Sequence, residues 1–115
     1  MISLKEIIEK LSLETLTSAG GADRPVRGGY AADLLSCAMK NARQDELWVT
    51  LQCHLNVVAV ASLINLAGVI ITEGNRPDAE AVARAEQEGV VLMATPKTTY
   101  TVVSELALLG VKGEP

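Results

Sequence analysis

The sequence predicts an α/β fold, a two-layer or three-layer sandwich in which helices cover a mostly parallel sheet of about four to five strands. Three short apolar runs, at residues 47–51, 69–71 and 90–94, each end in a small polar cluster that opens a stretch with helical spacing. Strands that alternate with helices in this way run parallel, because each helix returns the chain to the same end of the sheet. Hydrophobic residues make up 49% of the chain and aromatic residues only 3%. Such an aliphatic core is typical of a sheet covered on both faces.

The first elements are predicted to be a short helix and an edge strand. Ser3 and Glu6 have the spacing of a capping box and predict a helix that ends near Leu11. An edge strand is expected at residues 14–17, in a direction that the sequence leaves open. Small turn-forming residues and a proline predict a surface loop at residues 18–25.

The next segment is predicted to turn at Gly28-Gly29 and to enter a second helix at residues 31–43. The apolar positions of this helix recur at helical spacing: Leu34, Leu35, Ala38, Met39 and Ala42. After the central strand, Asn56 is expected to cap a third helix at residues 57–67. This helix is apolar nearly all round, which predicts that it is buried on several sides.

Two further strand–helix pairs complete the chain, at residues 69–89 and 90–110. Each helix has residues that favour its start and its end. These residues are Pro77, Asp78, Glu80 and Gly89 in the first pair, with Pro77 at the first helical position, and Thr98 or Thr99 with Gly110 in the second.

Length, net charge and hydropathy limit the classes of function that the chain can have. The length of 115 residues predicts a single domain over residues 1–115. The net charge of −4 and the absence of a basic stripe argue against nucleic-acid binding. Residues 55–72 are uncharged, but polar residues interrupt them, so we expect a buried helix and strand and no membrane span. The N-terminus lacks the pattern of a secretory signal, which predicts a cytoplasmic protein.

The sequence gives little support to catalysis. Cys37 and Cys53 form no CxxC pair and accompany a single histidine, so we expect reduced thiols and neither a metal nor another cofactor. The chain contains neither the GxxxxGK[ST] nor the GxGxxG phosphate-binding pattern. We therefore predict that the protein is not an enzyme; the alternative is a small enzyme that uses His54 or Glu73.

The polar clusters predict a binding site instead. The carboxyl ends of parallel strands meet at one edge of the sheet, where open α/β sheets bind ligands. Three cations fall beside this edge and suit an anionic group such as a phosphate, unless they are simply exposed loop charges: Arg27, Arg76 and Lys97.

The other expected site residues come from four segments of the chain. Gly28, Gly29 and Tyr30 form one wall of the predicted site, unless the two glycines only make a turn. Asp33 is expected in the first turn of the second helix, where it either faces the ligand or complements the helix dipole. The remaining candidates follow the three strands: His54 and Asn56, then Thr72, Glu73 and Gly74, then Thr95.

Three ordered motifs resemble the stand-alone DRTGG-domain proteins, and the resemblance runs from about Ser3 to Gly110. The motifs are Arg27-Gly28-Gly29-Tyr30-Ala31-Ala32-Asp33-Leu34-Leu35-Ser36, the segment at residues 50–61, and Ile71-Thr72-Glu73-Gly74-Asn75-Arg76-Pro77. The literal Asp-Arg-Thr-Gly-Gly string is absent, and Thr72-Glu73-Gly74 resembles a diverged form of its Thr-Gly-Gly part.

This resemblance implies a fold similar to that of the N-terminal domain of HPr kinase and a regulatory or assembly role. In that family, related copies are fused to phosphotransacetylase or lie between CBS domains in pyrophosphatases that respond to adenine nucleotides. The leading hypothesis is a non-catalytic regulatory module that binds a small anionic ligand, such as an adenine nucleotide, and forms a homodimer through its apolar surface. The alternative is a protein-interaction adaptor without a small-molecule ligand, in a larger redox or signalling complex.

Overall fold

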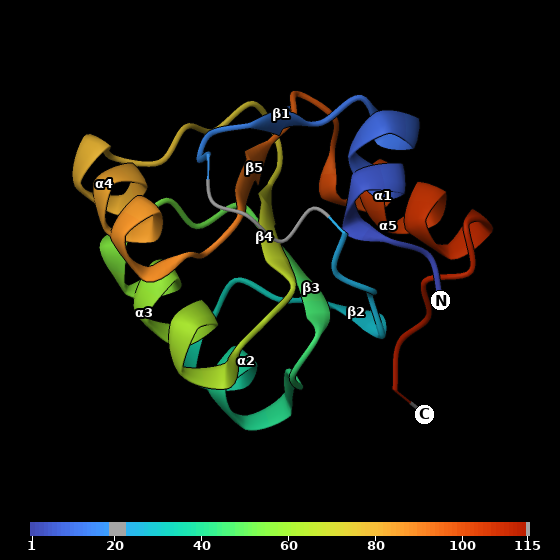
Figure 1. Ribbon diagram of the computed structural model, residues 1–115, viewed down its shortest axis with the longest axis horizontal. Coiled ribbons are helices and arrows are strands. Elements are labelled where there is room, and N and C mark those ends of the chain that lie inside the picture. The colour runs from blue at the N-terminus through green and yellow to red at the C-terminus, as the bar shows by residue number, and fades with distance from the viewer. Residues whose placement is uncertain (19–22, 115) are drawn as a thin grey trace.

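A five-stranded sheet forms the centre of the molecule. The computed structural model describes residues 1–18 and 23–114, and its strand order is β1-β5-β4-β3-β2 (Figure 1). Strands β2 to β5 run parallel, whereas β1 pairs with β5 in the antiparallel direction. The strands are β1 (Glu14–Thr15), β2 (Gly28–Ala31), β3 (Glu46–Thr50), β4 (Gly68–Ile71) and β5 (Leu92–Ala94).

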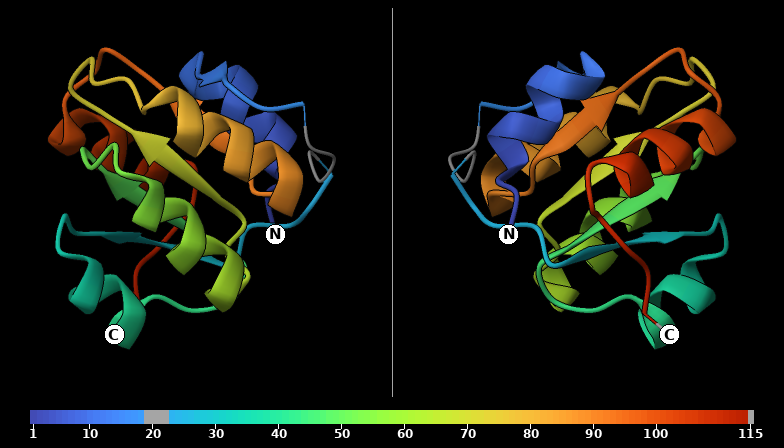
Figure 2. Two further views of the ribbon diagram at one scale, coloured as in Figure 1. Left: turned by 90° about the vertical axis from the view of Figure 1, so that its left-hand side faces the viewer. Right: turned by 90° about the vertical axis from the view of Figure 1, so that its right-hand side faces the viewer.

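Helices cover both faces of this sheet. They are α1 (Leu4–Leu11), α2 (Leu35–Asn41), α3 (Leu55–Ile64), α4 (Ala79–Glu88) and α5 (Thr99–Leu108). Figure 2 shows α2, α3 and α4 side by side on one face and α1 with α5 on the other. The structure is therefore a three-layer sandwich, and the predicted fold class is confirmed.

Two apolar layers hold the sandwich together. Alternate strand residues point to opposite faces, so that Ile70 packs toward α1 and α5 while its neighbour Val69 packs toward α2, α3 and α4. The only tryptophan, Trp48, is fully buried in the second layer. Its indole Nε1 donates to the carbonyl of Ala32 at 2.8 Å, which satisfies the one polar group that this side chain brings into the core.

Several helix boundaries match their sequence signals. The Ser3 side chain accepts a hydrogen bond from the Glu6 amide, and the Thr98 side chain accepts one from the Thr101 amide. Gly89 ends α4 with a φ of +71°, a conformation that favours glycine. Of the loop predicted at residues 18–25, residues 19–22 lie outside the part of the chain that the structure describes.

The prediction for residues 26–43 was wrong at its start. Gly28–Ala31 form a strand, not a turn, and the helix begins only at Leu35. Gly28 lies so close to the C-terminal tail that an added Cβ would stand 2.5 Å from the carbonyl oxygen of Lys112. The glycine therefore permits a close backbone approach, a role that strand propensities do not reveal.

Two further boundary predictions are corrected. His54, not Asn56, caps α3, because the His54 imidazole reaches the Asn56 amide. Pro77 precedes the N-cap residue of α4, Asp78, and does not occupy the first helical position. The outer face of α3 is also less buried than expected, since Leu63 remains 72% exposed.

Candidate functional site

The loops at the carboxyl ends of β3, β4 and β5 are joined by hydrogen bonds. The hydroxyl oxygens of Thr72 and Thr99 lie 2.6 Å apart, and the Gly74 amide donates to the Thr95 carbonyl at 3.1 Å. The Asn75 side-chain amide donates to the carbonyl of Leu51 at 3.1 Å. The predicted gathering of these loops along one edge of the sheet is therefore confirmed.

Two threonines of this edge are buried and hold the loops. The hydroxyl of Thr72 lies between the carbonyl of Thr50 and the hydroxyl of Thr99. The hydroxyl of Thr95 accepts a hydrogen bond from the Lys97 amide at 3.2 Å. Both side chains have protein partners and little exposed surface, so their direct effect is to fix the loops.

Glu73 places its own carboxylate at the positive end of a helix. Its Oε2 accepts a hydrogen bond from the Thr99 amide at 2.8 Å, at the start of α5. The backbone of Glu73 has a φ of +64°, a conformation that costs energy for any residue with a Cβ. Gly74 follows with a φ of +74°. The N-terminus of α5, an attractive place for an anion, thus holds an anion supplied by the chain itself.

Asp33 and His54 make local bonds that shape the loops. Asp33 precedes α2 and does not lie in its first turn, which corrects the prediction. Its Oδ1 accepts hydrogen bonds from the hydroxyl of Thr50 and the amide of Leu51, both at 3.0 Å. Nδ1 of His54 accepts from the Asn56 amide at 3.0 Å, so the neutral ring carries its proton on Nε2.

Arg76 and Lys97 both lie at this edge, and each contacts a carboxylate. Arg76 makes a bidentate salt bridge with Glu14 on β1, in which the two terminal guanidinium nitrogens donate to the two carboxylate oxygens at 2.7 and 3.1 Å. Hydrogen bonding to this guanidinium lowers the pKa of Glu14, and the same contact raises the pKa of Arg76. The Lys97 ammonium donates to Glu105 at 2.7 Å and to the carbonyl of Leu11 at 3.1 Å.

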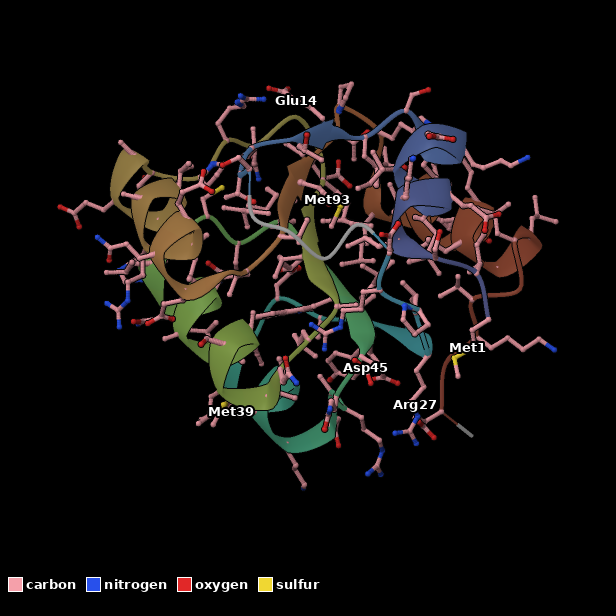
Figure 3. All side chains as sticks on the ribbon, viewed as in Figure 1. Met1, Glu14, Arg27, Met39, Asp45 and Met93 are labelled. Carbon is pink, nitrogen blue, oxygen red and sulfur yellow. The ribbon has the colours of Figure 1, made fainter. Side chains whose placement is uncertain are left out.

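Arg27 does not join them, contrary to the prediction. It precedes β2, at the amino end of the strands, where its amide donates to the Asp45 carbonyl at 2.9 Å. Its guanidinium lies 3.5 Å from Glu114. Figure 3 shows Arg27 beside Asp45 and far from Glu14. The physical reason is the unforeseen strand β2, which separates Arg27 from the carboxyl edge by the length of four residues.

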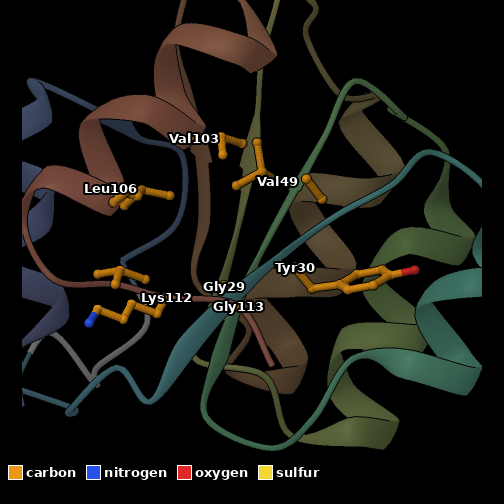
Figure 4. A pocket seen from close by; sticks show the side chains of 10 residues that line it. Gly29, Tyr30, Val49, Val103, Leu106, Lys112 and Gly113 are labelled. Atoms are coloured by element: carbon orange, nitrogen blue, oxygen red, sulfur yellow. The ribbon is translucent and has the colours of Figure 1, made fainter. Parts of the chain in front are cut away.

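A cavity of about 350 Å³ opens at this edge, between β1 and the loop that follows β4. Its lining residues are Ser12, Glu14, Gly74, Asn75, Arg76, Ala94, Thr95 and Pro96. Gly28, Gly29 and Tyr30, which were expected to form one wall of the site, do not line this cavity. Gly29 and Tyr30 instead line an apolar cavity of about 320 Å³ beside the edge of β2 (Figure 4).

Sequence reasoning missed Glu14 and Ser12 as parts of this site. Ser12 ends α1 and Glu14 begins β1, and both lie more than 60 positions before Arg76 in the sequence. The available signal was the predicted edge strand at residues 14–17. It places Glu14 at the carboxyl edge only if that strand runs antiparallel to its neighbour, as β1 does to β5, and the sequence left this direction open.

The described residues offer little for metal or nucleophilic chemistry. Within residues 1–18 and 23–114, no group of three His, Cys, Asp or Glu side chains is arranged to hold a metal ion. Cys37 and Cys53 are free and partly buried, as predicted. Burial raises the pKa of the Cys53 thiol, and the Asp78 carboxylate raises it further. This thiol is therefore a weaker nucleophile than an ordinary one.

The same described ranges contain no helix with the length and apolar character needed to cross a membrane.

Comparisons with known proteins point to one family. The family model of the DRTGG domain matches residues 6–109. No curated protein shows a significant match to the chain. Among solved structures, the chain is similar to the crystal structure of the CBS and DRTGG domains of the regulatory region of Clostridium perfringens pyrophosphatase, complexed with its activator, diadenosine tetraphosphate. The TM-score is 0.66 at 17% sequence identity, and the match covers 97% of this chain and 50% of that chain.

Proposed function

This chain belongs to the DRTGG domain family, and from that premise we propose that it is a regulatory module that binds an adenine nucleotide through its phosphates and associates with a second copy of itself. In this proposal the module carries out no reaction. The similar pyrophosphatase region, of which this chain spans about half the length, was crystallised with diadenosine tetraphosphate as activator. That complex supports the choice of ligand class.

The observation that carries the proposal is the environment of Arg76. Its side chain is 58% exposed at the rim of the carboxyl-edge cavity, and its partner there is the equally exposed Glu14. A guanidinium binds a phosphate with the same bidentate geometry that it uses for a carboxylate. The Glu14 carboxylate therefore stands where a phosphate of the ligand would bind, and it competes with that phosphate.

Lys97 is less suited to bind the ligand directly. Its ammonium is shared between Glu105 and a backbone carbonyl at the end of α1. Removing it from these contacts would leave the Leu11 carbonyl without this donor. We therefore assign the first ligand contact to Arg76 and a positioning role to Lys97, which holds the loop after β5 against α1.

The test is a binding titration, by calorimetry and by thermal shift, with diadenosine tetraphosphate, ATP and AMP as probes. Ligand that binds only the folded state raises the melting temperature in a saturable way. We expect Arg76→Ala to abolish this shift and Glu14→Gln to strengthen binding, because the substitution removes the competing charge. Arg84→Ala is the matched control, since Arg84 forms a similar exposed ion pair with Glu88 on α4.

Two results would contradict the proposal. If none of the nucleotides changes the melting temperature or releases heat, the protein has no nucleotide site. If nucleotides bind but Arg76→Ala and Glu14→Gln behave like Arg84→Ala, the site lies elsewhere.

A second candidate, an adaptor without a small-molecule ligand, is favoured by one specific observation. The Glu73 carboxylate already occupies the N-terminus of α5, the strongest anion-binding feature of this edge. The adaptor predicts that all three nucleotides leave the protein unaffected.

The self-association is supported by apolar surface. Tyr100 and Val103 lie one helical turn apart on α5 and are both exposed, and exposed apolar side chains that lie together mark an interaction site. Sedimentation over a range of concentrations tests this part independently of nucleotide binding. A monomer at all concentrations would contradict it.

A further inference from the structure

A buried glutamate at the amino end of β3 has no charged partner. Glu46 is only 1% exposed. Its Oε1 accepts a hydrogen bond from the Arg43 amide at 2.8 Å, and no ion pair among the described residues includes its carboxylate. Glutamates are almost never fully buried without a partner, because removing an unpaired carboxylate from water costs energy. Glu46 therefore lies where a cation would stabilise it.

This carboxylate reaches a cavity of about 340 Å³ that the proposed nucleotide site does not use. The cavity lies beside β2, on the side of the sheet where α2 ends, and Glu46 is one of its lining residues. Within residues 1–18 and 23–114, Oε2 of Glu46 makes no hydrogen bond, and no fully buried side-chain oxygen lacks a partner. Oε2 therefore has surface that is exposed to the cavity.

Positive charge exceeds negative charge at the mouth of this cavity. The Glu114 side chain is 39% exposed there, and the guanidinium groups of Arg27 and Arg43 lie 3.5 and 3.8 Å from its carboxylate. Two guanidinium groups thus share one carboxylate, at distances longer than those of charge-assisted hydrogen bonds. Both arginine side chains are more than half exposed, so either of them can turn toward another anion.

We propose that this cavity binds a free α-amino acid, with the ammonium group on Glu46 and the carboxylate on Arg43. The charges of the cavity have the matching order, from a buried carboxylate inside to an excess of guanidinium at the mouth. The proposal goes beyond the nucleotide site. Glu46 begins β3 and Arg76 follows β4, which runs parallel to β3, so the two sites lie at opposite ends of the sheet.

An ammonium group suits this cavity better than a metal ion does. In the described part of the chain, no three His, Cys, Asp or Glu side chains are arranged to hold a metal ion, whereas an ammonium needs one carboxylate and neutral acceptors. The end of a helix at Asn41 also favours a cation. The Asn41 side-chain amide donates to the Tyr30 hydroxyl at 3.4 Å, which leaves the hydroxyl hydrogen free to donate to the ligand carboxylate. Both side chains line the cavity.

The volume of the cavity also fits this class of ligand. An apolar cavity of about 150 Å³ holds one benzene molecule. By the same ratio, the 340 Å³ of this cavity has room for about 13 non-hydrogen atoms. Phenylalanine is of this size, so most of the common amino acids can enter.

Thermal-shift and calorimetric titrations of the whole chain with each of the common amino acids test the proposal, because a ligand of the folded state raises the melting temperature. Phenethylamine and phenylpropionate, which lack the carboxylate and the ammonium of phenylalanine respectively, separate the two charges. We expect each to bind at least about 10-fold more weakly than phenylalanine, because one charge-assisted contact is lost. If phenethylamine binds as tightly as phenylalanine, the role assigned to Arg43 is wrong.

Two variants locate the site. Glu46→Gln removes the charge and keeps an oxygen that can accept the hydrogen bond from the Arg43 amide, so we expect it to abolish amino-acid binding without lowering the melting temperature of the free protein. Arg43→Gln keeps that amide and should weaken binding about 10-fold. Lys40→Gln is the matched control, since Lys40 is an exposed cation in the last turn of α2 that does not line the cavity.

The proposal is wrong if no amino acid raises the melting temperature, or if binding survives unchanged in both Glu46→Gln and Arg43→Gln. If Glu46→Gln does not fold, as judged by circular dichroism, Arg43→Gln decides, because the side chain that it replaces is exposed. Arg76→Ala should leave amino-acid binding intact, so a failure of the nucleotide site and a failure of this site are separate results.

Discussion

Substitutions at Glu73 measure two opposing effects at one position. The left-handed backbone at Glu73, with its φ of +64°, costs a residue with a Cβ about 1–2 kcal/mol. The carboxylate offsets part of this cost through its hydrogen bond to the Thr99 amide and the dipole of α5, together about 1 kcal/mol. Glu73→Ala loses the carboxylate contact and keeps the backbone cost, so we expect it to lower the free energy of unfolding by about 1 kcal/mol.

Glu73→Gly is the informative partner of that variant. It also loses the carboxylate contact, but it relieves the backbone cost and adds about 0.5–1 kcal/mol of chain entropy to the unfolded state. These contributions nearly cancel, so the glycine variant should be about as stable as the native chain and about 1 kcal/mol more stable than the alanine variant.

Urea unfolding of the three proteins provides the measurement. A difference of this size also corresponds to about 4 °C in melting temperature for a domain of this length. The reasoning about backbone conformation would be refuted if the alanine variant proved as stable as the glycine variant. The reasoning about the helix contact would be refuted if the alanine variant matched the native chain.

Three further predictions test the fold and the site by the same unfolding measurements. Gly28→Ala should lower the free energy of unfolding by about 1–3 kcal/mol, because the added Cβ would lie 2.5 Å from the carbonyl oxygen of Lys112. Gly29→Ala is the control and should lower it less, because the nearest atom to its added Cβ lies at 3.5 Å. Arg76 lowers the pKa of Glu14, so their ion pair contributes to the free energy of unfolding above the usual pKa of a glutamate, and this contribution is lost as the pH falls below about 4. Glu14→Gln should remove this small loss of stability in acid. A Glu14→Gln protein that keeps the loss would contradict the assignment. Trp48→Phe should cost about 1–2 kcal/mol, since the half-buried carbonyl of Ala32 loses its donor, and a cost near zero would show that this bond is unimportant.

The parallel order of β3, β4 and β5 could be predicted from the sequence because each strand is a short aliphatic run followed by polar residues and a helical stretch. The boundaries of α1 and α5 could be predicted because Ser3 and Thr98 bond backbone amides three residues ahead. These signals are local, since the cap and its partner lie within one turn of the helix.

Strand β2 could not be predicted for a physical reason. Gly28 and Gly29 favour turns by intrinsic propensity, and they are in a strand because β3 offers a ladder on one side while the C-terminal tail approaches on the other. Both partners are distant in the sequence. The same error misplaced Arg27 and Asp33, because Arg27 directly precedes β2 and Asp33 follows it.

The structure shows which groups of the chain lie at the anion site predicted for the carboxyl edge. Two carboxylates of the chain itself stand where an anion would bind, Glu73 at the start of α5 and Glu14 on Arg76. The Glu73 contact also fixes a loop that begins at the buried Thr72, so a ligand that displaced it would disturb that loop. The Glu14 contact joins two exposed side chains, and exposed ion pairs contribute little to stability. A phosphate therefore meets less resistance at Arg76 than at α5, which makes Glu14→Gln, rather than a change at Glu73, the substitution that should strengthen nucleotide binding.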